Sequence, residues 1–160
     1  MASDAARDSP GRAALTIERD YDAPPEKVWQ AWTDPQALMK WFGPKDTESV
    51  LLAELDVQIG GRYHIAFVTG DGERHDVGGV YREVVTHRKL VFTWAWRTTP
   101  ERESLVTIVL QPAGSGTSLR FRHEQFFDEA ARDNHQRGWS GTFGKLDAYM
   151  DSLGPRAEAS

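Results

Sequence analysis

The sequence contains no cysteine, and its 19 Lys and Arg residues are outnumbered by 24 Asp and Glu. Without cysteine the chain has no disulfide, no thiolate metal ligand and no cysteine nucleophile, which agrees with a reducing cytoplasmic location. The net charge of −5 argues against nucleic acid as a partner, because binding to phosphates requires a concentrated basic surface.

Long apolar runs are missing as well. No stretch approaches the roughly 20 apolar residues that span a bilayer, so we expect no membrane insertion. The opening segment MASDAARDSPGR lacks the apolar centre of a secretory signal. We expect disordered ends at residues 1–13 and 154–160, and a single domain over residues 14–153.

Recognisable catalytic and metal motifs are also absent. The five histidines show no HxH or HExxH spacing. The chain has no G-x-S-x-G elbow, no phosphate-binding P-loop and no dinucleotide fingerprint. We therefore expect neither a metal nor a cofactor.

The pattern that is present predicts an α+β fold. Residues 14–21 alternate as a half-buried strand does, and the segments DAPPEKVWQAWTDP and QALMKWF that follow favour two short helices. Residues 128–153 have helical spacing. Between them, turn residues delimit six strands near 47–57, 62–69, 74–85, 89–98, 104–112 and 117–126. Short connections make these strands antiparallel neighbours, so we predict a seven-stranded antiparallel sheet covered by the long C-terminal helix.

Three glycines, Gly138, Gly141 and Gly144, lie inside the predicted C-terminal helix. Each costs about 1 kcal/mol of helix stability relative to alanine. They either let the helix press closely on the sheet or leave empty volume beneath it. The spacing alone allows both interpretations.

Four blocks of sequence carry a family resemblance. They read YDAPPEKVWQAWTDPQALMKWFGP at 21–44, DVQIGGRY at 56–63, GVYREV with LVFTWAW at 79–84 and 90–96, and HQRGWSGTFGKL at 135–146. In this order they resemble the heat-shock-protein ATPase activator-like branch of the START-like (SRPBCC) superfamily, to which polyketide cyclases and birch-pollen-allergen-like proteins belong. Gly138 is part of the family pattern, whereas Gly144 departs from it.

The resemblance implies the helix-grip fold, in which a curved sheet wraps the C-terminal helix and the two enclose a largely apolar pocket open at one end. Aromatic walls with a few polar groups are typical of small-ligand sites. We therefore predict a protein that binds a small hydrophobic or aromatic molecule, lipids included. The predicted ligand-binding residues are the inward-facing side chains Trp41, Tyr63, Phe67, Tyr81, Trp94, Trp96, Phe121, His123, Trp139 and Phe143.

Two other functions remain open. An enzyme of the cyclase, aromatase or hydrolase type would use His123, Tyr81 and Glu83 as acid and base groups. Glu83 is either exposed at a strand end, or shares the inward face of Tyr81 with Arg19 as a candidate charge partner. A chaperone- or stress-related interaction module would instead present an exposed apolar patch. A homodimer is a further hypothesis, which exposure of Trp41 or Phe42 would favour.

Overall fold

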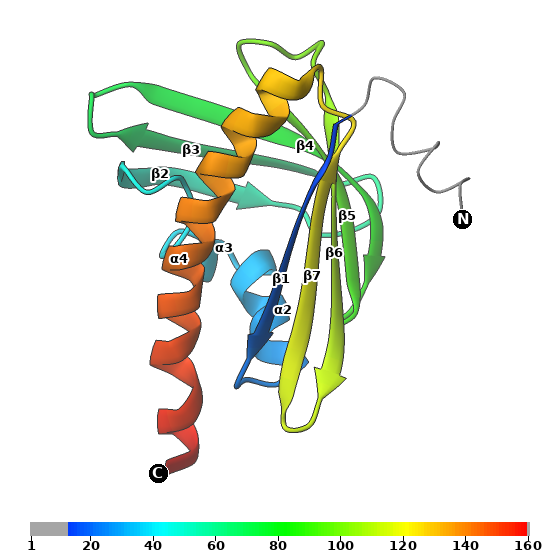
Figure 1. Ribbon diagram of the computed structural model, residues 1–160, viewed down its shortest axis with the longest axis vertical. Coiled ribbons are helices and arrows are strands. Elements are labelled where there is room, and N and C mark those ends of the chain that lie inside the picture. The colour runs from blue at the N-terminus through cyan, green and yellow to red at the C-terminus, as the bar shows by residue number, and fades with distance from the viewer. Residues whose placement is uncertain (1–12, 160) are drawn as a thin grey trace.

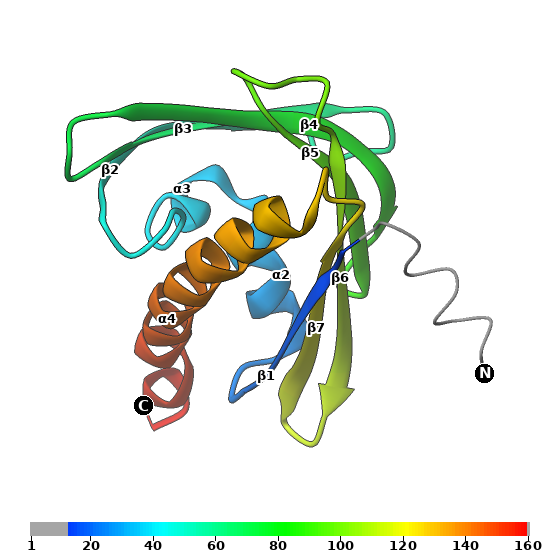
Figure 2. The same cartoon turned by 45° about the horizontal axis from the view of Figure 1, so that its top comes forward.

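Seven strands form one antiparallel sheet that curves around a long C-terminal helix in the computed structural model (Figures 1 and 2). The structure describes the backbone of residues 13–159 and the side chains of residues 13–153. The elements are β1 (Leu15–Tyr21), α2 (Pro25–Thr33), α3 (Pro35–Leu38), β2 (Thr47–Leu55), β3 (Arg62–Thr69), β4 (Arg74–Val85), β5 (Lys89–Trp96), β6 (Ser104–Ala113), β7 (Gly116–Glu124) and α4 (Glu129–Ala159). The predicted fold class, a helix-grip α+β fold, is confirmed.

The strand order β1-β7-β6-β5-β4-β3-β2 makes a meander of six strands, with β1 added beside β7. Alternation decides which side of each strand is buried. On β7, Leu119, Phe121 and His123 face inward and are fully buried, whereas Arg120 is exposed. The inward side chains of the sheet therefore form one wall of the core.

A register shift in β4 interrupts this alternation. The pairing of β4 with β5 shifts between Tyr81 and Glu83, and such a bulge re-aims the side chains that follow it. Tyr81 is buried, whereas Glu83 is half-exposed and pairs with Lys89 at 3.3 Å. The alternative that Glu83 shares the inward face of Tyr81 and pairs with Arg19 is therefore wrong, and Glu83 instead lies partly exposed near the end of β4. Arg19 instead contacts the carboxylate of Asp147 on α4 at 3.0 Å.

Helix α4 begins just after Asp128, whose Oδ1 accepts the backbone N–H of Ala131 at 2.8 Å, as an N-terminal capping residue does. It lies on the concave side of the sheet, with α2 and α3 beside its middle turns (Figures 1 and 2). The helix continues to Ala159, past the predicted end near Leu153. None of the described helices is both long and apolar enough to cross a membrane.

The predicted disordered ends fall largely outside the described residues. Residues 1–12 and residue 160 are not described, so disorder in the lead-in 1–13 stays a prediction. The predicted tail, 154–160, is partly covered by the backbone of α4, and its side chains lie outside the described part.

Candidate functional site

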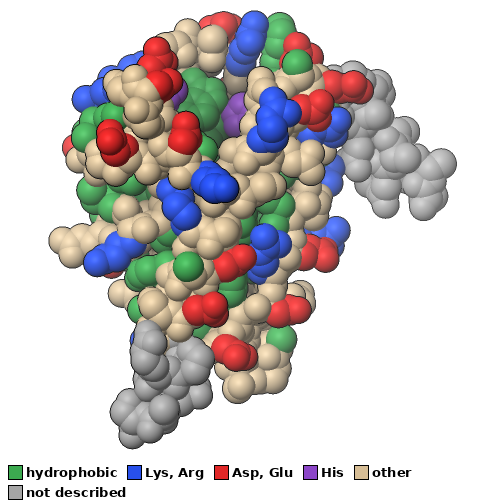
Figure 3. Space-filling view, turned by 60° about the vertical axis from the view of Figure 1, so that its left-hand side comes forward, with side chains coloured by type: hydrophobic (Ala, Val, Ile, Leu, Met, Phe, Trp, Pro, Cys, Tyr) green, Lys and Arg blue, Asp and Glu red, His purple; other side chains and the backbone are tan. Residues whose placement is uncertain are grey.

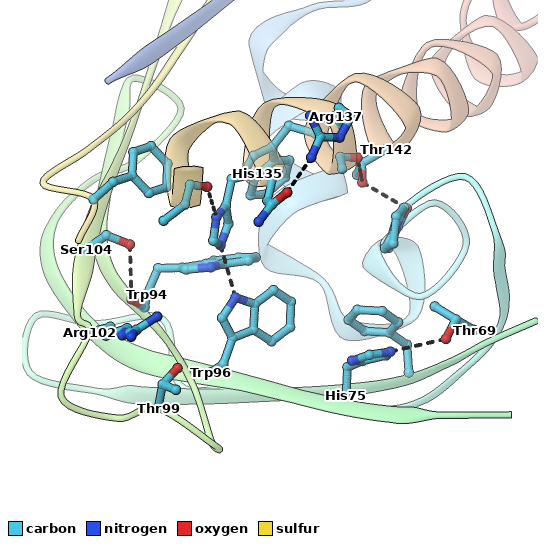
Figure 4. Close-up of a pocket in the computed structure, with 18 of the residues that line it drawn as sticks. Thr69, His75, Trp94, Trp96, Thr99, Arg102, Ser104, His135, Arg137 and Thr142 are labelled. Carbon is cyan, nitrogen blue, oxygen red and sulfur yellow. Dashed lines mark hydrogen bonds between the residues drawn. The ribbon is translucent and has the colours of Figure 1, made fainter. Parts of the chain in front are cut away.

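A cavity of about 950 Å³ lies between the inner face of β3–β5 and the first turns of α4 (Figure 4). Its mouth is the hollow in Figure 3, where apolar and histidine side chains lie inside a rim that carries charged groups. The lining residues are Phe42, Gly43, Pro44, Lys45, Asp46, Phe67, Thr69, His75, Trp94, Trp96, Thr99, Arg102, Ser104, Phe126, Phe127, Asp128, Ala130, Ala131, Asn134, His135, Arg137, Gly138, Trp139 and Thr142.

Aromatic rings make up most of the inner wall. Trp94 and Trp96 share the inward face of β5, with ring centroids 5.5 Å apart. Trp139 descends from α4 to within 5.1 Å of the Trp94 ring, and Phe42 closes the wall at 6.1 Å from that ring. Such edge and tilted contacts hold each ring in place and add stability beyond the buried area.

Two crossed tryptophan–histidine hydrogen bonds tie α4 to the sheet. Trp96 of β5 donates its indole N–H to Nε2 of His135 on α4 at 3.0 Å (Figure 4). In the opposite direction, Trp139 of α4 donates to Nδ1 of His123 on β7, also at 3.0 Å. Each bond joins a helix residue to a strand residue, so the two together fix how α4 sits above the sheet.

These bonds determine the tautomer of both histidines. Since Nε2 of His135 accepts, its Nδ1–H donates to the carbonyl of Ala131 at 2.7 Å. Since Nδ1 of His123 accepts, its Nε2–H donates to the hydroxyl of Ser104 at 2.7 Å, and that hydroxyl donates to the carbonyl of Trp94. Both imidazoles are therefore neutral, with both ring nitrogens occupied.

Burial lowers the pKa of both histidines. For His123, which is 0% exposed, desolvation holds the pKa well below its ordinary value, and the neighbouring His135 lowers it further. For His135 desolvation also lowers the pKa, although the hydrogen bond to Ala131 opposes the shift. The rings lie 5.2 Å apart between centroids, so protonation of one disfavours protonation of the other.

We expect the free energy of unfolding to fall as the pH is lowered from 7 to 5. Unfolded histidine has a pKa of about 6.5, whereas the folded pKa of His123 and His135 is lowered. Below pH 6.5 the unfolded state therefore binds more protons, and each histidine contributes up to about 1.4 kcal/mol per pH unit. Above pH 7 both are neutral in both states and the contribution is flat. Urea denaturation at pH 7, 6 and 5 measures the slope.

The variant His135→Gln tests whether this pH dependence comes from the buried histidine pair. Glutamine cannot titrate, but its side-chain oxygen can still accept the N–H of Trp96. The pH dependence between 7 and 5 should therefore be clearly weaker in His135→Gln than in the parent protein. An unchanged slope would contradict the assignment of acid sensitivity to this buried pair.

One corner of the cavity is polar. The hydroxyl of Thr69, at the end of β3, lies 2.6 Å from Oδ1 of Asp71 and 3.1 Å from Nε2 of His75 on β4 (Figure 4). The His75 ring stacks on Phe67 at 5.2 Å and meets the edge of Trp96 at 6.3 Å. Thr69, Phe67 and Trp96 thus hold this imidazole in one orientation at the cavity wall.

The mouth carries an exposed aromatic ring. Gln125, directly after β7, has a positive φ of 66°. Of the two phenylalanines that follow this turn, Phe126 is buried whereas Phe127 is 59% exposed. The guanidinium of Arg102 lies 3.9 Å above the Phe127 ring, within the range of a cation–π contact. Arg102 and Phe127 therefore form one side of the rim.

The three glycines of α4 have different surroundings. A Cβ at Gly141 would lie 2.8 Å from the backbone nitrogen of Lys45, so this glycine allows close packing against the loop after α3, not against the sheet. A Cβ at Gly138 or Gly144 would meet no atom within 4 Å. Gly138 lines the cavity and leaves it room, whereas Gly144 faces outward.

The predicted ligand-binding residues fall into two groups, those that line the cavity and those that are buried elsewhere in the core. Phe67, Trp94, Trp96 and Trp139 line the cavity. The other six are buried behind its wall or beyond it: Trp41, Tyr63, Tyr81, Phe121, His123 and Phe143. Tyr63 and Tyr81 border a separate void of about 20 Å³, a volume suited to a single water molecule.

The three acid–base candidates do not converge. His123 is fully buried, with both ring nitrogens bonded to protein groups. Tyr81 lies in the core beside Phe92, where burial raises the pKa of its hydroxyl. Glu83 lies on the far side of the bulge, paired with Lys89. No common cavity wall brings His123, Tyr81 and Glu83 together.

Thr69, His75, Arg102 and His135 line the cavity although the sequence analysis did not select them. The sequence does contain a signal that places His75 on the cavity side of the sheet. The turn TGDGE at 69–73 sets the register that pairs Phe67 with His75, and directly paired residues share a face. His135 bonds through Nδ1 to the carbonyl of Ala131 in the preceding turn of α4 and through Nε2 to Trp96 at the cavity wall.

The exposed aromatic side chains that would favour a homodimer are not observed at Trp41 or Phe42. Trp41 is 0% exposed and Phe42 is 4% exposed, so neither offers an apolar surface to a second copy. Dimerisation stays a prediction.

Within the described residues, no group of three His, Asp or Glu side chains is arranged to hold a metal ion.

Comparisons with known proteins agree with this geometry. The family model for Activator of Hsp90 ATPase homolog 1-like proteins matches residues 22–151. No curated protein matches the chain. Among solved structures, a Chromobacterium violaceum protein is 29% identical with a TM-score of 0.78, covering 86% of this chain and 96% of its own. The AHSA1 protein of Silicibacter pomeroyi is 28% identical with a TM-score of 0.77, covering 87% and 98%. An AHSA1-like protein of Aeromonas hydrophila, 21% identical with a TM-score of 0.73 over 88% and 93%, shares the fold.

Proposed function

Because the chain belongs to the family of Activator of Hsp90 ATPase homolog 1-like proteins, whose fold suits a ligand-binding or a chaperone-related role, we propose that it binds a small, largely aromatic molecule. The ligand occupies the cavity between β3–β5 and the first turns of α4. The observation that carries this proposal is a cavity of about 950 Å³ walled by tryptophan and phenylalanine rings. Sites for small molecules typically have volumes of about 300–1,000 Å³ and aromatic linings.

The hydrogen bonds in the wall support an apolar ligand. The indole N–H groups of Trp96 and Trp139 are already bonded to His135 and His123. Both histidines are neutral and internally bonded, so this part of the wall offers ring surface rather than free donors. The indole N–H of Trp94 is buried and has no partner among the described residues, so it is the exception in this wall. A flat apolar molecule can bury its area against the rings of Trp96 and Trp139 without breaking their hydrogen bonds.

Gly138 provides the sharpest test. The variant Gly138→Phe places a ring in the open space at the cavity, and we expect it to weaken binding of 2-methoxynaphthalene at least tenfold in equilibrium dialysis. The control Gly144→Phe puts the same side chain on the same helix, facing outward, and should leave binding unchanged. Failure of the unsubstituted protein to bind the probe, or equal binding by Gly138→Phe, would overturn the proposal.

A second measurement identifies the natural ligand. Native mass spectrometry of freshly purified protein, followed by organic extraction, should reveal a small aromatic or lipid adduct at one copy per chain. The adduct should be depleted in Gly138→Phe and retained in Gly144→Phe. An adduct equally abundant in both variants would be bound elsewhere.

A chaperone-related role, which the family description also allows, ranks below ligand binding. Such a module would use a contiguous apolar surface. The large apolar side chains that are exposed among the described residues, Leu51, Ile59, Val85 and Phe127, come from four different segments. They do not favour this role in the way that the aromatic cavity favours ligand binding.

A further inference from the structure

The polar corner of the cavity has an arrangement of protons that can be derived from its contacts. The carboxylate of Asp71 can only accept a hydrogen bond, so at 2.6 Å the hydroxyl of Thr69 must donate to it. That hydroxyl has a single proton. The carbonyl of Glu73, 3.4 Å away, can also only accept. The contact with Nε2 of His75 at 3.1 Å therefore requires Nε2 to carry a proton and to donate it.

With Nε2 as the donor, the other ring nitrogen of His75, Nδ1, is available as a hydrogen-bond acceptor. Nδ1 has no hydrogen-bond partner among residues 13–153, although the ring lines the cavity. The ring cannot easily turn away, because it stacks on Phe67 and meets the edge of Trp96. A fixed imidazole with one uncommitted nitrogen is thus held among aromatic rings.

We infer that the cavity selects an aromatic ligand that carries a hydroxyl group, and that this hydroxyl donates a hydrogen bond to Nδ1 of His75. The inference rests on the proposed function and names its ligand class. The aromatic body lies against Trp96 and Phe67, and the hydroxyl reaches the polar corner. A plain hydrocarbon would leave Nδ1 without a partner in a largely apolar site, which costs binding free energy.

A hydroxyl group suits Nδ1 better than the other polar groups do. Because Nε2 carries the ring proton, Nδ1 offers a lone pair and needs a donor. A carboxylate, an ether or a carbonyl oxygen can only accept, so it leaves Nδ1 without a partner. An ammonium group can donate, but it loses its hydration among aromatic rings at a cost greater than one hydrogen bond recovers.

The test compares 2-naphthol with 2-methoxynaphthalene, which has the same ring system but no hydroxyl proton. Equilibrium dialysis at pH 7 should give a dissociation constant about tenfold lower for 2-naphthol, as one satisfied hydrogen bond implies. In His75→Phe the two constants should become equal, with 2-methoxynaphthalene still bound. The control His87→Asn removes a histidine from the β4–β5 turn, at a residue with positive φ that asparagine tolerates, and should keep the tenfold preference.

The variant Thr69→Val covers the case in which His75→Phe does not fold. Valine has nearly the same shape but cannot accept the Nε2–H, so the ring loses its orientation and the preference should fall to about threefold or less. Equal binding of the two compounds by the unsubstituted protein would overturn this inference and leave the proposed function intact. A full preference retained in either the His75 or the Thr69 variant would also overturn it. Binding of neither compound would overturn the proposed function and this inference together.

Discussion

Trp139→Ala is expected to lower the free energy of unfolding by about 3–5 kcal/mol, the usual cost of removing a large aromatic side chain from a core. The Trp139 ring is buried and lies 4.5 Å from Phe121 and 5.1 Å from Trp94 between centroids. Its loss also leaves Nδ1 of His123 without a donor. Since a domain of this kind has about 5–15 kcal/mol of stability in total, urea denaturation should show a strongly reduced midpoint.

Two further variants separate the causes. Trp139→Phe keeps an aromatic ring but removes the N–H that reaches His123, and it should cost about 1–3 kcal/mol, the penalty of one buried acceptor left unpaired. Trp29→Ala is the matched control, because Trp29 is only half-buried and its ring meets His87 edge-on at 6.2 Å. If Trp139→Ala cost no more than Trp29→Ala, the crossed bonds would not be what holds α4 to the sheet.

The fold could be predicted because its information is local. Strict alternation over short segments identifies half-buried strands, and turn residues at short spacing leave antiparallel pairing as the only option. The bulge between Tyr81 and Glu83 could not be predicted in this way. A register shift depends on how two strands meet, and no residue in the segment YRE indicates it. Its consequence is that Glu83 leaves the face of Tyr81 and pairs with Lys89.

The position of the cavity was less predictable than its existence. Alternation tells which side chains point inward, but not how deep they lie. Phe121 and Trp94 both point inward, yet only Trp94 reaches the cavity. Depth is set by where α4 rests, and tertiary contacts between distant segments fix this. Trp96 with His135 is one such contact, and Gly141 with Lys45 is another.

Gly141→Ala is expected to destabilise the protein relative to Gly144→Ala by about 1–3 kcal/mol. Both substitutions replace a glycine inside the same helix, so each gains about 1 kcal/mol of helix propensity. At Gly144 the new methyl group meets no atom within 4 Å and the gain is kept. At Gly141 it would lie 2.8 Å from the backbone nitrogen of Lys45. Backbone cannot rotate away as a side chain can, so the loop must move at the cost typical of overpacking.

Denaturation of both variants at pH 7 measures the difference directly, with the helix-propensity gain common to both. Equal stabilisation in the two would mean that the loop of residues 43–46 yields freely and does not position α4. A second readout distinguishes local strain from general destabilisation. Because Gly43 and Lys45 line the cavity, a displaced loop should also change the affinity for 2-methoxynaphthalene in Gly141→Ala, whereas Gly144→Ala should bind it as the unsubstituted protein does. In that case Gly141 sets the distance between α4 and the loop, and Gly138, one turn earlier in the helix, leaves the cavity open.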